Sequence, residues 1–142
     1  MGEAFSAQFA VRWSDLDSNG HMANTAFMEY AIQSRFLGFQ AHGFSPQALH
    51  DSGIGPAVFR DEASYMKELR ILDPFTVTFY VSKLSDNGVR FTLQHDILRA
   101  DGQRAAHILT QGAWFDLRLR KLAPPPDALT AILRALLIED GG

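Results

Sequence analysis

The segment from Arg12 to Asn24 (RWSDLDSNGHMAN) concentrates residue types that acyl-transfer chemistry uses. Two carboxylates, an amide and an imidazole alternate along it, at Asp15, Asp17, Asn19 and His21. A carboxylate can act as a general base toward water, or it can attack a carbonyl carbon itself. Gly20 carries no side chain, so the backbone there can approach a ligand closely. The segment therefore suggests a site at which an acyl carbonyl is attacked.

The same residue types also build ordinary turns between a strand and a helix, so a structural role is an equal alternative for each of them. A calcium loop would start with a similar alternation of acids and amides. However, Ala26 stands at the twelfth position, where the bidentate glutamate belongs. The chain has no cysteine, and its histidines are not at metal-ligand spacing. We expect no metal and no cofactor.

An unusually apolar helix is expected from about Asn24 to Gln40. Its polar residues form one narrow stripe, made of Thr25, Glu29, Gln33 and Gln40. A helix that is apolar around most of its circumference must be buried on several sides, which a curled sheet can achieve. The start of this helix would offer free N–H groups and the positive end of the helix dipole to a developing oxyanion.

Alternating apolar and polar residues predict an antiparallel sheet of about five strands. Asn87-Gly88 and Asp101-Gly102 supply the tight turns of two hairpins. The expected strands are Phe5–Trp13, Pro56–Leu69, Phe75–Ser82, Val89–Ile97 and Leu109–Leu119. A short helix should run from Ser45-Pro46 to Gly53, and a terminal helix from Asp127 to Ile138. We therefore expect one α+β domain over residues 1–142, with the sheet wrapped around the long central helix.

The segment resembles the hotdog-fold thioesterases, the family of 4-hydroxybenzoyl-CoA thioesterase and its bacterial acyl-CoA relatives. It is still closer to the plant acyl-ACP thioesterases, whose signature runs Asp-x-Asn-x-His-Val-Asn-Asn. The matching residues here are Asp17, Asn19, His21 and Asn24, while Ala23 replaces the first asparagine of the final pair. The order of strand, long helix and further strands is the hotdog layout, so the resemblance covers most of the chain.

This resemblance implies a role for each matching residue. Asp17 would be the catalytic carboxylate, Asn19 would orient the substrate carbonyl or the attacking water, and His21 would position or polarise the substrate. Glu68 follows Tyr65 in the Tyr-x-x-Glu context in which the acyl-ACP enzymes place a second catalytic glutamate. A surface ion pair with a neighbouring cation is the stronger alternative for Glu68. Asp15 is expected to tether the turn.

Residues around this centre are expected to contact the substrate. The candidates are Gly20, Met22, Asn24, Phe27, Tyr30 and Phe59, although the apolar ones would also serve as ordinary core. The phosphates of CoA need Arg or Lys at the mouth of the pocket. Arg60, Lys67, Arg70 and Arg90 are available for this, and the sequence does not choose among them.

Charge and hydropathy restrict the partners. The net charge is −3, and such an acidic chain is not typical of nucleic-acid binding. No apolar run is long enough to span a bilayer and the first residues do not form a secretory signal, so we expect a cytoplasmic protein with no membrane partner. Hotdog subunits join edge to edge, and the resemblance therefore implies a homodimer or homotetramer.

The leading hypothesis is hydrolysis of an acyl-CoA or acyl-ACP thioester, with Asp17 as general base or as nucleophile. A hotdog dehydratase or hydratase is a second possibility, in which His21 would act together with an acid. A non-catalytic module that binds acyl thioesters is the third.

Overall fold

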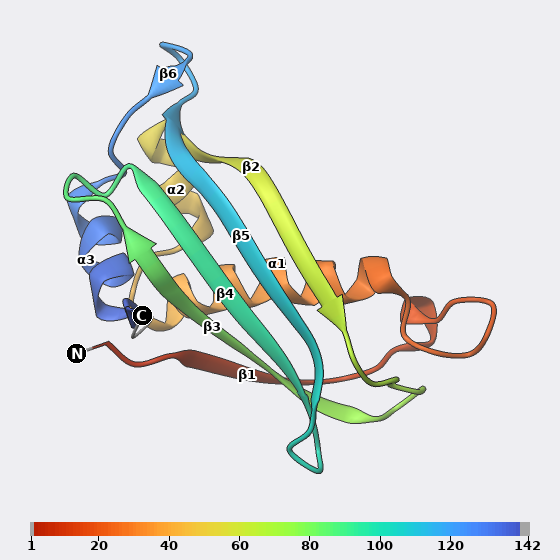
Figure 1. Ribbon diagram of the computed structural model, residues 1–142. Helices are drawn as coiled ribbons and strands as arrows, with labels where there is room; N and C mark the ends of the chain where they lie inside the picture. The colour runs from red at the N-terminus through yellow and green to blue at the C-terminus, as the bar shows by residue number, and fades with distance from the viewer. Residues whose placement is uncertain (1, 140–142) are drawn as a thin grey trace.

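The computed structural model describes residues 2–139, and its centre is a curled antiparallel sheet with one long helix across it (Figure 1). The strands lie in the order β1-β3-β4-β5-β2, and β6 pairs with β5. Their bounds are β1 Phe5–Ala10, β2 Ile54–Tyr65, β3 Pro74–Leu84, β4 Arg90–Arg99, β5 Arg104–Asp116 and β6 Lys121–Leu122. The helices are a 3-10 turn at Trp13–Asp15, α1 Asn24–Ala41, α2 Pro46–Ser52 and α3 Asp127–Ala135.

Helix α1 lies across one face of the sheet, while α2 and α3 cover the end of the sheet near β6 (Figure 1). The buried residues of α1 form one broad face: Ala26, Phe27, Tyr30, Ala31, Ser34, Gly38 and Phe39. Ile32 and Phe36, which the apolar pattern had also predicted to be buried, are 40% and 37% exposed. Gly38 lets the helix approach β3, because a side chain there would meet the Phe79 ring at 3.0 Å. The antiparallel sheet and its central helix agree with the hotdog layout that the sequence suggested. No helix within residues 2–139 is both long enough and apolar enough to cross a membrane.

The first strand ends earlier than its alternating pattern predicted. It stops at Ala10 rather than Trp13, and residues 13–15 form a 3-10 turn. The cause is the Asp15 carboxylate, which accepts a hydrogen bond from the Arg12 backbone N–H at 2.9 Å and thereby closes the turn. The turn leaves Trp13 80% exposed, although the pattern had placed it on the apolar face of a strand.

Three other predicted elements also had wrong boundaries. The second strand runs from Ile54 to Tyr65 and ends before Leu69. After Tyr65 the chain bonds instead to Ala105, at the start of β5, and to Met22, in the loop before α1. The last long strand spans 104–116 instead of 109–119, since the Asp116 carboxylate accepts the N–H groups of Arg118 and Leu119 and so forms a turn. Helix α3 ends at Ala135 rather than Ile138, where the chain turns to hydrogen-bond with Val81.

Candidate active site

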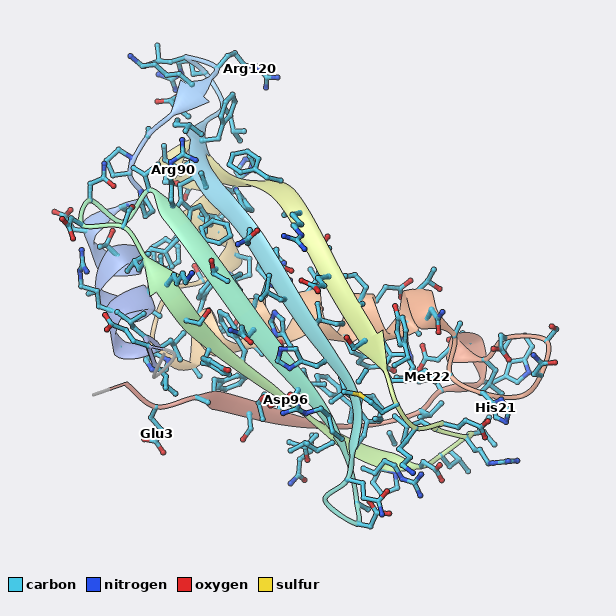
Figure 2. The ribbon with its side chains drawn as sticks, viewed as in Figure 1. Glu3, His21, Met22, Arg90, Asp96 and Arg120 are labelled. Atoms are coloured by element: carbon cyan, nitrogen blue, oxygen red, sulfur yellow. The ribbon has the colours of Figure 1, made fainter. Side chains whose placement is uncertain are left out.

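A tight loop from Asp17 to His21 connects the 3-10 turn to α1, at the far end of the sheet from Arg90 and Arg120 (Figure 2). The Asp17 N–H donates to the His21 carbonyl at 2.8 Å, and the Gly20 N–H donates to the Asp17 carbonyl at 3.2 Å. Gly20 has a φ of +78°, a left-handed conformation that glycine adopts without steric cost. These bonds fold the polar residues of the segment into one compact turn.

The Asp17 carboxylate is oriented by its own loop. Its Oδ1 accepts the backbone N–H groups of Asn19 at 2.8 Å and His21 at 3.2 Å. Within residues 2–139, its second oxygen accepts no hydrogen bond, and the side chain is exposed to solvent. One oxygen is thus held in place while the other is available to a water molecule or a carbonyl carbon.

His21 and Glu68 are brought together across two segments of the chain. The His21 Nε2 lies 3.1 Å from the Glu68 Oε2, and the Arg70 Nη2 lies 3.6 Å from the same oxygen. The Met22 N–H donates to the Leu69 carbonyl at 2.7 Å, so the backbone after β2 is attached to the loop. Glu68 therefore takes part in an ion pair, as the structural alternative expected, and also lies beside the candidate catalytic loop.

The start of α1 is not capped by a side chain. Ala23 occupies the N-cap position and has no side-chain acceptor to offer. The N–H groups of Ala26 and Phe27 bond to the Ala23 carbonyl, whereas those of Asn24 and Thr25 have no acceptor in the described part of the chain. Free N–H groups at the positive end of a helix dipole form an anion-binding site.

Asp15 occupies a different environment from Asp17, two residues away. Its carboxylate is buried and accepts hydrogen bonds from the Arg12 Nη2 at 3.0 Å and from the Tyr30 hydroxyl at 2.5 Å. Burial raises the pKa of this carboxyl, but the hydrogen bonds from Arg12 and Tyr30 outweigh burial and hold the pKa below its usual value. Asp15 thus stays ionised and tethers the turn from inside.

A pocket of about 650 Å³ opens beside the loop and the helix start. The rings of Phe27 and Tyr65 meet edge to face in its wall, with centroids 5.6 Å apart. Its charged residues come from the candidate catalytic loop, from the segment after β2 and from the end of β4. The lining consists of Asp17, His21, Met22, Asn24, Phe27, Tyr65, Met66, Lys67, Glu68, Arg70, Asp73 and Arg99.

The structure gathers most of the predicted site residues around this pocket. Those that line it are Asp17, His21, Met22, Asn24, Phe27 and Glu68. Asn19 and Gly20 are exposed in the adjoining loop and do not line the pocket. Tyr30 instead faces Asp15 and lines a separate cavity, and Phe59 lies at an irregularity of β2, beside a groove with Lys83 and Leu84.

Several lining residues were not predicted to contact substrate. Tyr65 and Met66 follow directly from the end of β2, and Asp73 accepts the Arg70 N–H at 2.9 Å in the next turn. Arg99 ends β4, opposite Phe75 in the β3–β4 register. No local pattern marks Arg99 because only the pairing of distant strands places it near the loop.

The thioesterase-like superfamily is the family whose sequence pattern matches this chain, over residues 11–133. The chain belongs to this superfamily. The matched range contains the loop, the start of α1 and every residue of the pocket. The resemblance to hotdog-fold thioesterases is thereby confirmed. None of the curated proteins shows significant sequence similarity to this superfamily member.

Solved structures show the same fold at low sequence identity. The hypothetical protein SAV2348 from Staphylococcus aureus, in complex with CoA, is 17% identical with a TM-score of 0.86, over 100% of this chain and 90% of that one. Slr0204 from Synechocystis, a 1,4-dihydroxy-2-naphthoyl-CoA thioesterase, is 19% identical with a TM-score of 0.85, over 94% and 98%. YbaW from Escherichia coli, a probable thioesterase, is 22% identical with a TM-score of 0.76, over 94% and 98%.

Proposed function

We propose that this protein hydrolyses acyl-CoA thioesters, with Asp17 as the catalytic carboxylate. The observation that carries this proposal is the position of Asp17. Its carboxylate has one oxygen held by the loop and one free, and it lies in the same pocket as the uncapped start of α1. An attacking group beside an oxyanion-binding site is the minimum that hydrolysis of an acyl thioester requires.

The substrate carbonyl oxygen would accept hydrogen bonds from the free N–H groups of Asn24 and Thr25. In the general-base form, Asp17 takes a proton from a water molecule while the water oxygen bonds to the carbonyl carbon. The carbon–sulfur bond then breaks, and the thiolate takes up the proton. In the nucleophilic form, an Asp17 oxygen attacks the carbon, the thiolate leaves, and water hydrolyses the resulting anhydride. Asn19 and His21 orient the Asp17 carboxylate through their backbone N–H groups.

Three cations favour CoA over acyl carrier protein as the thiol carrier. Two of them, Lys67 and Arg70, follow β2, and the third, Arg99, ends β4. All three line the same pocket. CoA has a diphosphate and a ribose phosphate, whereas the arm of a carrier protein has only one phosphodiester. Guanidinium and ammonium groups bind such phosphates by charge-assisted hydrogen bonds. The CoA complex of the structurally similar SAV2348 supports the same choice.

The proposed assembly is a homodimer, or a tetramer built from such dimers. Strand β2 is a free edge of the sheet, with Val58 47% and Phe59 59% exposed. Exposed apolar edges promote pairing with another strand. A two-fold antiparallel pairing along β2 brings the start of one β2 toward Tyr65 and the pocket of the other subunit, and places Phe59, near the middle of β2, beside the partner's strand.

Release of free thiol from a panel of acyl-CoAs tests the reaction. We expect Asp17→Asn to lower the rate about 10²- to 10⁴-fold, the range for loss of a general base. Asp86→Asn, on the exposed β3–β4 turn, is the matched control and should keep the wild-type rate. Unchanged thiol release in Asp17→Asn would exclude this assignment. Hydration of an enoyl-CoA without thiol release would indicate the dehydratase alternative, and binding with neither reaction would indicate a binding module.

Truncated substrates test the choice of CoA. Lys67→Gln and Arg99→Gln should each raise KM for acyl-CoA about tenfold, because each removes a charged hydrogen bond worth about 1.5 kcal/mol. The same variants should leave KM unchanged for acyl-pantetheine, which lacks the phosphates. An equal rise for both substrates would show that these cations do not bind the nucleotide.

A further inference from the structure

Tyr30 is held rigidly in the core, two turns into α1. Its ring packs against Phe9, with centroids 5.0 Å apart, and against Phe75, with centroids 4.9 Å apart, and these two rings are stacked on each other. The Arg12 guanidinium lies over the same ring at 5.7 Å from its centroid. The Phe9 and Phe75 rings and the Arg12 guanidinium together fix the direction of the phenol, so its hydroxyl group is aimed at one point.

That point is the Asp15 carboxylate, which the Tyr30 hydroxyl meets at 2.5 Å. Asp15 is attached to α1 a second time through its backbone, because its carbonyl accepts the Ala23 N–H at 2.9 Å. Ala23 is the residue immediately before the helix. The 3-10 turn is therefore joined to α1 at the helix start and again seven residues into the helix.

The loop that carries Asp17 is exposed, and its far end is attached to the segment after β2 through His21 and Met22. Asp17 follows Asp15 by two residues, and within residues 2–139 its carboxylate accepts hydrogen bonds only from the exposed backbone of Asn19 and His21. The position of this loop relative to the free N–H groups of α1 is set at its two ends. One of those ends is the buried Asp15.

We propose that Tyr30 is a positioning residue for Asp17, acting through Asp15, rather than a wall of the acyl pocket. The inference rests on the proposed function, in which the attacking group and the oxyanion site must keep a set separation. The Tyr30 hydroxyl holds Asp15 against the helix that supplies the oxyanion site. Since a misplacement of about 1 Å can cost about 10²-fold in rate, a missing hydroxyl group affects catalysis from outside the pocket.

Steady-state kinetics of Tyr30→Phe, measured well below the unfolding transition, tests this role. We expect kcat to fall about 10- to 100-fold while KM changes by less than about twofold, because the pocket that binds substrate is intact. Tyr80→Phe is the matched control and should keep wild-type kcat. Tyr80 follows the buried Phe79 along β3, so it lies on the face of the strand away from α1. Wild-type kcat in Tyr30→Phe would overturn the proposal.

A double-mutant cycle separates positioning through Asp15 from an independent effect. Asp15→Asn should lower kcat to a similar extent, and the double variant should be no slower than the worse single variant. Losses that multiply would show that the two residues act separately and would contradict the proposal.

A second measurement does not depend on enzymatic activity. Backbone NMR order parameters at Asn19 and His21 should fall from about 0.85 toward about 0.6 in Tyr30→Phe and remain unchanged in Tyr80→Phe. Order parameters equal to those of the wild type would overturn the positioning role even if the protein released no thiol from any acyl-CoA. Increased motion together with absent thiol release would leave the positioning role standing and reject the proposed function instead.

Discussion

Gly20 is the residue whose conformation the candidate catalytic loop, Asp17 to His21, depends on most directly. Its φ of +78° lies in the left-handed region, and a Cβ at this position would meet no atom within 4 Å. An alanine would therefore be strained by its backbone alone, without any clash. The same combination, with a φ of +91°, occurs at Gly43 after α1, far along the chain from the loop.

These two glycines make a matched pair of variants. Gly20→Ala and Gly43→Ala should each lower the free energy of unfolding by about 1 kcal/mol, the cost of a left-handed conformation with a side chain. Only Gly20→Ala should also lower the rate of thiol release, because it alone moves Asp17. Urea denaturation and the thiol assay provide the two measurements. Equal loss of activity in both variants would mean that stability, not loop geometry, limits the rate.

The contact between α1 and the sheet contains a buried polar chain of hydrogen bonds. The Arg35 Nε donates to the His95 Nε2 at 3.0 Å, and its Nη2 donates to the Thr110 hydroxyl at 2.7 Å. Thr110 in turn donates to the Asp61 carboxylate at 2.5 Å, and the His95 Nδ1 lies 3.2 Å from the Ser34 hydroxyl. The chain joins the helix to β4, β5 and the edge strand β2.

Burial sets the protonation of this network. Desolvation lowers the pKa of Arg35 to about 10, which leaves it charged at neutral pH. Desolvation first, and then the charge of Arg35, lower the pKa of His95 well below 6.5. His95 is therefore neutral in the folded chain, and its Nε2 is free to accept the hydrogen bond from Arg35.

A dependence of stability on pH follows from the His95 shift. Below its unfolded-state pKa near 6.5, His95 binds a proton in the unfolded chain but not in the folded one. The free energy of unfolding should therefore fall with decreasing pH, by up to about 1.4 kcal/mol per unit from this group. His95→Gln keeps an acceptor but does not titrate, so it should flatten the profile between pH 6.5 and 5, as measured by urea denaturation. An unchanged slope would show that another group causes it.

At the scale of the whole molecule, the two edges of the sheet differ in their chemistry. Along β1, exposed residues alternate with half-buried ones, and Gln8 is one of the exposed positions. Along β2, exposure is nearly continuous and includes the apolar Val58 and Phe59. On α1, Ile32 is also 40% exposed. This contrast is why a second subunit is expected at β2 rather than at β1.

A lysine on each edge tests that expectation. Wild-type protein should have at least twice the 15.8 kDa subunit mass by light scattering after size exclusion. Val58→Lys should convert it to monomer and lower thiol release, since a charge on an edge strand opposes pairing. Gln8→Lys adds the same charge to β1 and should leave both mass and activity unchanged. A wild-type monomer, or a dimer sensitive only to Gln8→Lys, would reject pairing along β2.

The sequence alone was sufficient for features that depend on neighbouring residues. Apolar residues dominate α1 outside one polar stripe, so burial of the helix against the sheet was predictable, as were the tight turns at Gly88 and Gly102. Strand ends were predicted less well, because a single carboxylate can stop an alternating pattern. Asp15 does this after β1, and Asp116 does it after β5.

The candidate site divides in the same way. The backbone N–H groups of Asn19 and His21 both donate to the Asp17 carboxylate in a short loop, so the grouping of these residues could be read from their spacing. Glu68 was found only through a family resemblance, and Arg99 was not found because β4 meets the loop only after the sheet has formed.

Tyr30 shows most clearly what only the tertiary structure decides. On an apolar helix, a tyrosine is equally compatible with a core position, a pocket wall or a hydroxyl group in use. Phe9 and Phe75 lie opposite each other on the neighbouring strands β1 and β3, which are far apart in the sequence. Their packing against Tyr30 directs its hydroxyl group to Asp15. The local spacing of the residues between Arg12 and Asn24 therefore predicts which polar groups gather in the loop. The position of these groups relative to α1 depends on contacts between residues far apart in the chain.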